Sequence, residues 1–140
     1  MNIHAVRERT TLLIPVRGIR VLSGSERKLP CPPEPRALGE AVAALWTDLR
    51  ADRLRENPQA KPYWIQPGIR SFKAFQRSAP MVDAYWEGET ITIQPWDGRS
   101  ERGFVPLAGE TAVLPAGVPP EELGAAIWAA LSARVERERG

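Results

Sequence analysis

The chain has 140 residues, of which 43% are hydrophobic and 26% are charged, and its formal net charge is +2. These values are ordinary for a globular protein, so they argue against wholesale disorder and favour one domain. The apolar runs are too short to span a bilayer, and the charged N-terminal segment lacks the apolar core of a signal peptide. The single cysteine excludes an intramolecular disulfide and a cysteine metal site. We therefore expect a soluble cytoplasmic protein.

The first third of the chain predicts little regular structure. Thr11 to Val16 and Ile19 to Leu22 are short apolar runs separated by Arg17-Gly18, a pattern that predicts two strands joined by a turn. The charged segment before them, which contains His4, predicts a strand start or a loose end. Residues 23–36 contain four prolines and predict a flexible, extended connector.

A long helix is predicted over Ala37–Glu56. Leu38, Val42 and Leu45 repeat near the helical period, and the stripe continues to Leu54. Asn57-Pro58 ends the helix, because proline and the residue before it disfavour helical backbone. The proline-rich stretch that follows predicts a loop with room for one short strand.

The segment from Ser71 to Pro95 predicts a short helix followed by a hairpin. Ser71 is a suitable N-cap residue, and Pro80 stops the helix because it has no N–H to donate. Met81–Trp86 and Thr90–Gln94 then alternate in polarity on either side of a turn that contains Gly88. Alternation around a glycine turn is typical of two half-buried antiparallel strands.

The C-terminal part predicts further strands and a second long helix. Phe104–Leu107 and Thr111–Leu114 are short apolar runs. Pro120–Arg134 has prolines and glutamates at its start and an apolar stripe, which favour a helix. The alternating charges of residues 135–140 predict a frayed tail.

These elements predict the α+β class: one domain over residues 1–140, with a mainly antiparallel sheet packed against two long helices and one short helix. Both long helices begin with a Leu-Gly pair, Leu38-Gly39 and Leu123-Gly124. A glycine near a helix start allows a close backbone approach, and we expect the sheet to be the approached surface.

The order of motifs resembles a known family. The Ser-Phe-Lys start of the short helix, the strand–turn–strand, its Ile-x-Pro ending and the two Leu-Gly helices resemble the immunity proteins of bacterial contact-dependent growth inhibition systems, the CdiI family. The resemblance covers most of residues 37–133. It implies a cytoplasmic α+β protein that binds and neutralises the cognate toxin C-terminal domain of a large secreted exoprotein. Such a toxin is often a nuclease, and the immunity protein occludes its active site or substrate groove.

The sequence lacks the residue constellations of an enzyme. The only histidine, His4, has no cysteine or acid beside it, and nothing near Cys31 would lower the pKa of its thiol. No glycine-rich phosphate loop is present. Asp83, Glu87 and Glu89 do not form a recognisable metal-ligand set. We therefore predict no catalytic activity, no cofactor and no metal.

The hairpin is instead the predicted partner-binding region. All its charges are acidic, and Tyr85 and Trp86 should project from opposite faces of one strand. Aromatic side chains beside carboxylates are typical of interfaces with basic proteins. The predicted partner-binding residues are Asp83, Tyr85, Glu87, Glu89, Trp96 and Asp97. Pairing of a toxin segment with an exposed sheet edge is a second mode of binding.

The alternative function is a small nucleic-acid-binding module. Residues 50–77 carry seven basic residues against two acidic ones, and Tyr63 and Trp64 lie among them as candidate stacking platforms. The basic residues are Arg50, Arg53, Arg55, Lys61, Arg70, Lys73 and Arg77. The low net charge and the adjacent acidic hairpin count against this function. A regulatory or scaffold domain without a toxin partner is a third alternative.

Overall fold

The computed structural model describes residues 1–139 and contains one large antiparallel sheet and a small hairpin. The strand order is β5-β2-β1-β6-β7-β8, β9 also pairs with β7, and β3 pairs with β4 alone. The strands are β1 (Asn2–Val6), β2 (Thr10–Ile14), β3 (Val16–Arg17), β4 (Arg20–Val21), β5 (Arg27–Pro30), β6 (Met81–Glu87), β7 (Thr90–Asp97), β8 (Val105–Pro106) and β9 (Ala112–Pro115). The predicted pairing of β6 with β7 is confirmed.

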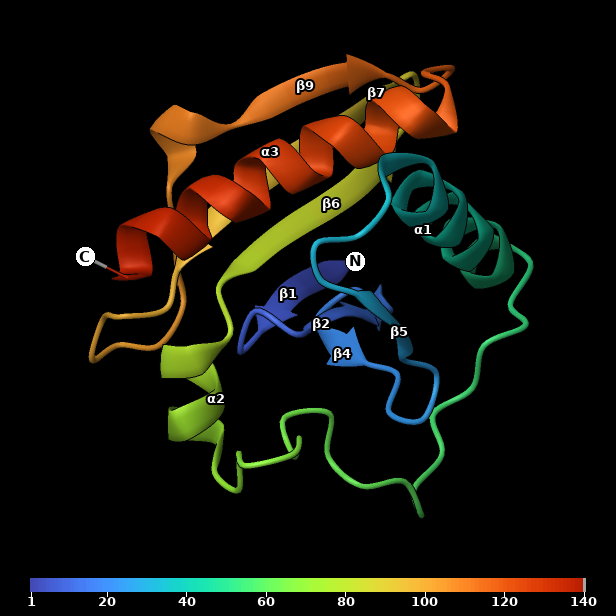
Figure 1. Cartoon of the computed structure of the whole chain (residues 1–140). Helices are drawn as coiled ribbons and strands as arrows, with labels where there is room; N and C mark the ends of the chain where they lie inside the picture. The colour runs from blue at the N-terminus through green and yellow to red at the C-terminus, as the bar shows by residue number, and fades with distance from the viewer. Residues whose placement is uncertain (140) are drawn as a thin grey trace.

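Two long helices cover one face of this sheet. The helices are α1 (Pro35–Arg50), α2 (Phe72–Ser78), the short 3-10 helix η1 (Ala108–Glu110) and α3 (Pro120–Arg139). Figure 1 shows α3 running along β6 and β7, with α1 crossing near its N-terminal end. Alternate strand residues such as Ile3, Leu13 and Ile93 are fully buried against these helices. The α+β class, the antiparallel sheet and the two long and one short α-helices are confirmed.

The two Leu-Gly pairs serve a different contact from the predicted one. A Cβ on Gly39 would overlap the carbonyl oxygen of Pro120, and a Cβ on Gly124 would overlap that of Pro35. Each glycine therefore receives the first turn of the other helix, and the expected approach to the sheet is wrong. Because glycine has no side chain, the two helix starts cross in backbone contact.

A smaller apolar cluster covers part of the second face. Helix α2 and the loop before it pack Phe75 and Ile69 against Leu12 and Ile14 of β2. The α2 helix begins as predicted, since the Oγ of Ser71 accepts a hydrogen bond of 3.1 Å from the backbone N–H of Ala74. This cluster lies over β1 and β2, whereas β6 and β7 extend beyond it.

The N-terminal third is more ordered than the sequence predicts. The segment expected to be a strand start or loose end is β1, which lies between β2 and β6. Its His4 is buried, with Nδ1 3.0 Å from the carbonyl oxygen of Ala79 and its ring 4.7 Å from that of Phe75. The predicted connector over residues 23–36 is also wrong in part, because it contains β5 and the first two residues of α1.

Two helix boundaries differ from the prediction. Helix α1 ends at Arg50 rather than Glu56, and Asp52 adopts a left-handed backbone with φ of +55°. Leu54 still packs against the main core, which explains why the apolar stripe continues past the helix. Helix α3 includes most of the predicted frayed tail, because Val135 is buried against that core. Within residues 1–139, none of the helices is long and apolar enough to cross a membrane.

Candidate partner-binding face

Strand pairing places four of the six predicted partner-binding residues on one face of the sheet. Asp83, Tyr85 and Glu87 alternate along β6, so their side chains point to the same side. Trp96 of β7 pairs with Met81, which belongs to the same alternating set. Helices α1 and α3 pack on the opposite side of these strands, and we call the side that carries this set the open face.

The β3–β4 hairpin turns the open face into a groove with a volume of about 590 Å³. Val16, Ile19 and Val21 line the groove from the hairpin, while Tyr85 and Trp96 line it from the sheet. Ile19 stands at the tip of the hairpin and is fully exposed. The site therefore has apolar walls that the protein does not bury by itself, a feature typical of binding surfaces.

Polar groups in the groove differ in how well they are satisfied. The carboxylate of Asp83 lies 3.3 Å from the amino group of Met1 and is already paired. The indole Nε1 of Trp96 is buried without a hydrogen-bond acceptor among the described residues. An unsatisfied buried N–H of this kind costs about 1–3 kcal/mol.

The other two predicted residues lie outside the groove. Glu89 is exposed in the β6–β7 turn beside Gly88, whose φ is +57°. Asp97 has the opposite alternation from Trp96 and accepts a hydrogen bond of 2.9 Å from the backbone N–H of Arg99. This hydrogen bond lowers the pKa of the Asp97 carboxyl below its usual value. The predicted set is therefore not one contiguous site.

The sequence also matches a family model. The model for CdiI, the CDI immunity protein, matches residues 46–133. The chain belongs to this family. The matched stretch contains β6 and β7 and hence the sheet side of the groove, while the β3–β4 hairpin lies before it. A comparison with curated proteins gives no match.

A solved structure supports the fold of this CDI immunity family member. A protein of unknown function from Neisseria meningitidis has a similar structure, with a TM-score of 0.66 and 16% sequence identity. The similarity covers 94% of this chain and 92% of the Neisseria chain. It thus extends to the N-terminal strands, which the family model does not match.

Three of the seven basic residues of the rival function make contacts within the protein. The guanidinium of Arg50 lies 3.1 Å from the centre of the Trp86 ring, and Arg53 and Arg55 form ion pairs with acidic neighbours. Tyr63 packs edge-on against Phe75 of the smaller cluster. Trp64 packs against the same cluster. The two predicted stacking platforms are therefore partly used to cover the sheet.

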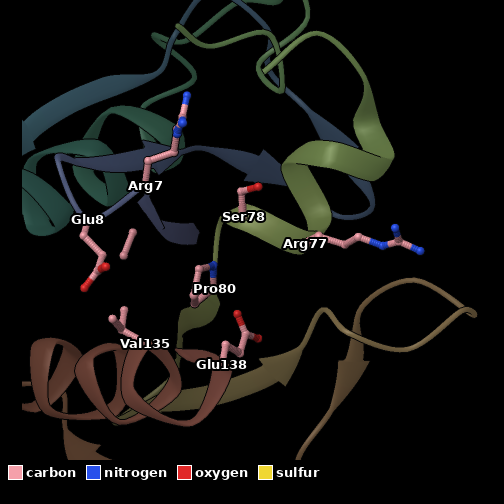
Figure 2. A pocket seen from close by; sticks show the side chains of 8 residues that line it. Arg7, Glu8, Arg77, Ser78, Pro80, Val135 and Glu138 are labelled. Carbon is pink, nitrogen blue, oxygen red and sulfur yellow. The ribbon is translucent and has the colours of Figure 1, made fainter. Parts of the chain in front are cut away.

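A second cavity lies between α3, the β1–β2 turn and the end of α2 (Figure 2). Burial raises the pKa of the Glu138 carboxyl above its usual value, and the backbone of Gly98 and the charge of Arg134 oppose this effect. One helical turn earlier, the Nε of Arg134 has no hydrogen-bond partner among the described residues, while its Nη1 lies 3.5 Å from a carboxylate oxygen of Glu110. In Figure 2 the side chain of Arg77 points away from this cavity. The cavity is therefore a weaker candidate for a binding site than the groove.

The residues with catalytic chemistry are placed unfavourably for it. Burial lowers the pKa of His4 to about 4, so its ring is neutral and hydrogen-bonded inside the fold. Burial raises the pKa of the Cys31 thiol, which makes it a poor nucleophile near neutral pH. The part of the chain that the structure describes holds no cluster of three metal-ligating side chains.

Sequence reasoning missed the β3–β4 hairpin as a wall of the site. Its two-residue loop has Gly18 at φ of +64°, the first position of a type II′ turn, and places Ile19 second. Turns favour polar residues and glycine, so an isoleucine there gains neither turn propensity nor burial. This local mismatch was the one signal available in the sequence.

Proposed function

We propose that this protein binds the toxin domain of a contact-dependent growth inhibition system and neutralises it by occluding the toxin's active site or substrate groove. The partner is the C-terminal domain of a large secreted exoprotein. The protein acts in the cytoplasm of the cell that makes it, without a cofactor and without catalysis of its own. Membership of the CDI immunity family is the observation that carries this proposal.

The open face is the surface we assign to the toxin. It offers the half-exposed ring of Tyr85, the indole of Trp96 and the carboxylate of Glu87 beside one groove. Aromatic residues dominate binding energy when a partner covers them, and carboxylates complement a basic surface. A nuclease toxin presents such a basic surface where it binds its substrate, so the open face would compete directly with nucleic acid.

The test uses the domain encoded at the 3′ end of the exoprotein gene next to this one. Cells that express the domain should survive when they also express this protein and stop growing without it. In a purified system, Trp96→Ala should weaken binding by about 2 kcal/mol or more. Thermal melts of the variant serve as the folding control. If the unaltered protein neither protects cells nor binds the domain, the proposal fails.

The same preparation tests the nucleic-acid alternative. Direct binding of the protein to DNA or RNA, with an affinity that falls steeply as salt is added, would favour that function. We expect no such binding, because Arg53 and Arg55 are paired with carboxylates and the rings of Tyr63 and Trp64 pack in part against the smaller cluster. Turnover of nucleic acid that survives purification would overturn the expectation of no catalysis.

A further inference from the structure

The groove on the open face has a mixed chemistry that restricts its occupant. Its hairpin wall is aliphatic, with Val16, Ile19 and Val21, and its sheet wall is aromatic, with Tyr85 and Trp96. Asp83 and Glu87 add carboxylates beside these walls. A purely apolar side chain would bury the carboxylate of Glu87 without compensation, and an acidic one would be repelled.

Cations of the protein itself do not neutralise this groove fully. The two arginines of the hairpin point to the segment after α1, where Arg17 pairs with Asp52 at 2.8 Å and Arg20 pairs with Glu56. Those contacts hold the hairpin from its outer side. Glu87 is exposed and forms no ion pair with any residue of the described chain. One carboxylate of the groove therefore remains available.

The protein itself contains an arginine side chain packed on an aromatic surface of this kind. On the opposite side of β6, the guanidinium of Arg50 stacks on the ring of Trp86 at 3.1 Å. An arginine side chain has an aliphatic stem that packs on apolar surface and a planar cationic head that stacks on aromatic rings. These are the properties that the groove's aliphatic wall, aromatic wall and free carboxylate require.

We propose that the groove receives an arginine side chain of the toxin domain, and this inference rests on the proposed function. The stem packs between Ile19 and Tyr85, and the guanidinium pairs with Glu87. The partner is thus a basic surface with a protruding arginine at the centre of the contact.

The matched pair Glu87→Gln and Glu89→Gln tests this inference. Both variants remove one negative charge within two residues of each other, but only Glu87 lines the groove. Dissociation of the complex with the toxin domain is followed by surface plasmon resonance. We expect Glu87→Gln to raise the dissociation rate about tenfold and Glu89→Gln to change it by less than about twofold, because only a desolvated ion pair acts mainly on dissociation.

Two further variants distinguish an arginine from other occupants. Tyr85→Leu keeps apolar area but removes the ring, and should also speed dissociation. Ile19→Ser removes the aliphatic wall and should do the same. Equal effects of the two glutamine variants, or slower dissociation of Glu87→Gln, would overturn the arginine assignment while leaving the toxin-binding function intact. Failure of the unaltered protein to bind the domain would overturn both.

Discussion

The two parts of the sheet's second face differ in what covers them. Over β1 and β2, the apolar side chains of Leu12 and Ile14 are buried beneath Phe75 of α2. Over β6 and β7, the same side of the sheet carries Tyr85 and Thr92, which face each other across the strands and remain partly exposed. One continuous surface therefore passes from a closed core to an open groove.

This difference predicts that the covered residues mainly affect the free energy of unfolding and the open residues mainly affect binding. The covered part gains free energy from buried apolar area, so its residues are chosen for packing. The open part leaves aromatic area exposed, so its residues contribute less to folding. The opposite face of β6 and β7 packs on α1 and α3. This packing holds the two strands in place, so their position does not depend on the side chains of the open groove. Substitutions in the closed and open regions should therefore affect different measurements.

The largest expected effect concerns the crossing of α1 and α3, which cover the opposite face of the sheet. Gly39→Val would place side-chain atoms where the backbone of Pro120 lies, and Gly124→Val would do so at Pro35. Overpacking of this kind should cost about 4 kcal/mol or more in the free energy of unfolding, because backbone cannot move aside as a side chain can. Urea denaturation followed by circular dichroism measures this cost.

Gly109→Ala is the matched control, since a Cβ at that position meets no atom within 4 Å. Its midpoint of unfolding should stay within the range of ordinary surface substitutions. If the valine variants unfold at the same urea concentration as this control, the two helices do not cross in backbone contact.

The second prediction compares two aromatic residues on the two parts of the face. Phe75 is fully buried, and Phe75→Ala should cost about 3–5 kcal/mol of stability. Tyr85 is 36% exposed, and Tyr85→Ala should cost less than about 1 kcal/mol while weakening toxin binding more strongly. Equal losses of stability in the two variants would show that the open face is part of the folding core.

The third prediction concerns pH. Burial lowers the pKa of His4 to about 4 from a usual value of 6.5, so the folded state binds fewer protons than the unfolded state between these values. The stabilisation from neutral His4 is therefore complete above pH 6.5 and is lost as the pH falls toward 4. The loss should be about 3 kcal/mol, measured as the free energy of unfolding at each pH.

His4→Gln is the control for other titrating groups. Glutamine retains a donor for the carbonyl of Ala79 but does not titrate, so the variant should be less stable at neutral pH and flatter in its pH dependence. Parallel curves for the two proteins would mean that His4 does not titrate in this range.

The sequence predicted those elements whose local signals agree with one another. The Ser71 cap, the Pro80 stop, the Gly88 turn and the alternation of β6 all act within a few residues, and the structure has the short helix and hairpin that they predict. The open face follows from the same alternation. What the sequence alone could not reveal is which side the helices cover, because that depends on packing between distant segments.

The missed elements depend on such long-range packing. Strand β1 is short and contains His4, and it is stabilised by β2 and β6 on either side rather than by local propensity. The end of α1 was obscured because Leu54 continues the apolar period after the left-handed backbone at Asp52 has ended the helix. The hairpin wall lies more than 60 residues from Tyr85 in sequence. No periodicity signals a contact of that kind.

The smallest effect is expected at the tip of the open region. Glu89 is exposed in the β6–β7 turn and does not line the groove, so Glu89→Lys should change stability by less than about 0.5 kcal/mol. Exposed charges act mainly on encounter, through a field that reaches about 10 Å at 0.1 M salt. With a basic toxin domain, the variant should therefore associate more slowly, while the dissociation rate stays nearly unchanged.

Salt provides the control, because screening should bring the association rates of the variant and the unaltered protein together as salt is raised toward about 0.5 M. Stopped-flow mixing at several salt concentrations measures these rates. A faster association of Glu89→Lys would mean that this end of the hairpin meets an acidic surface. The contact with a basic toxin surface would then be confined to the groove around Glu87. The turn at Glu89 and the groove at Glu87 would meet toxin surfaces of opposite charge.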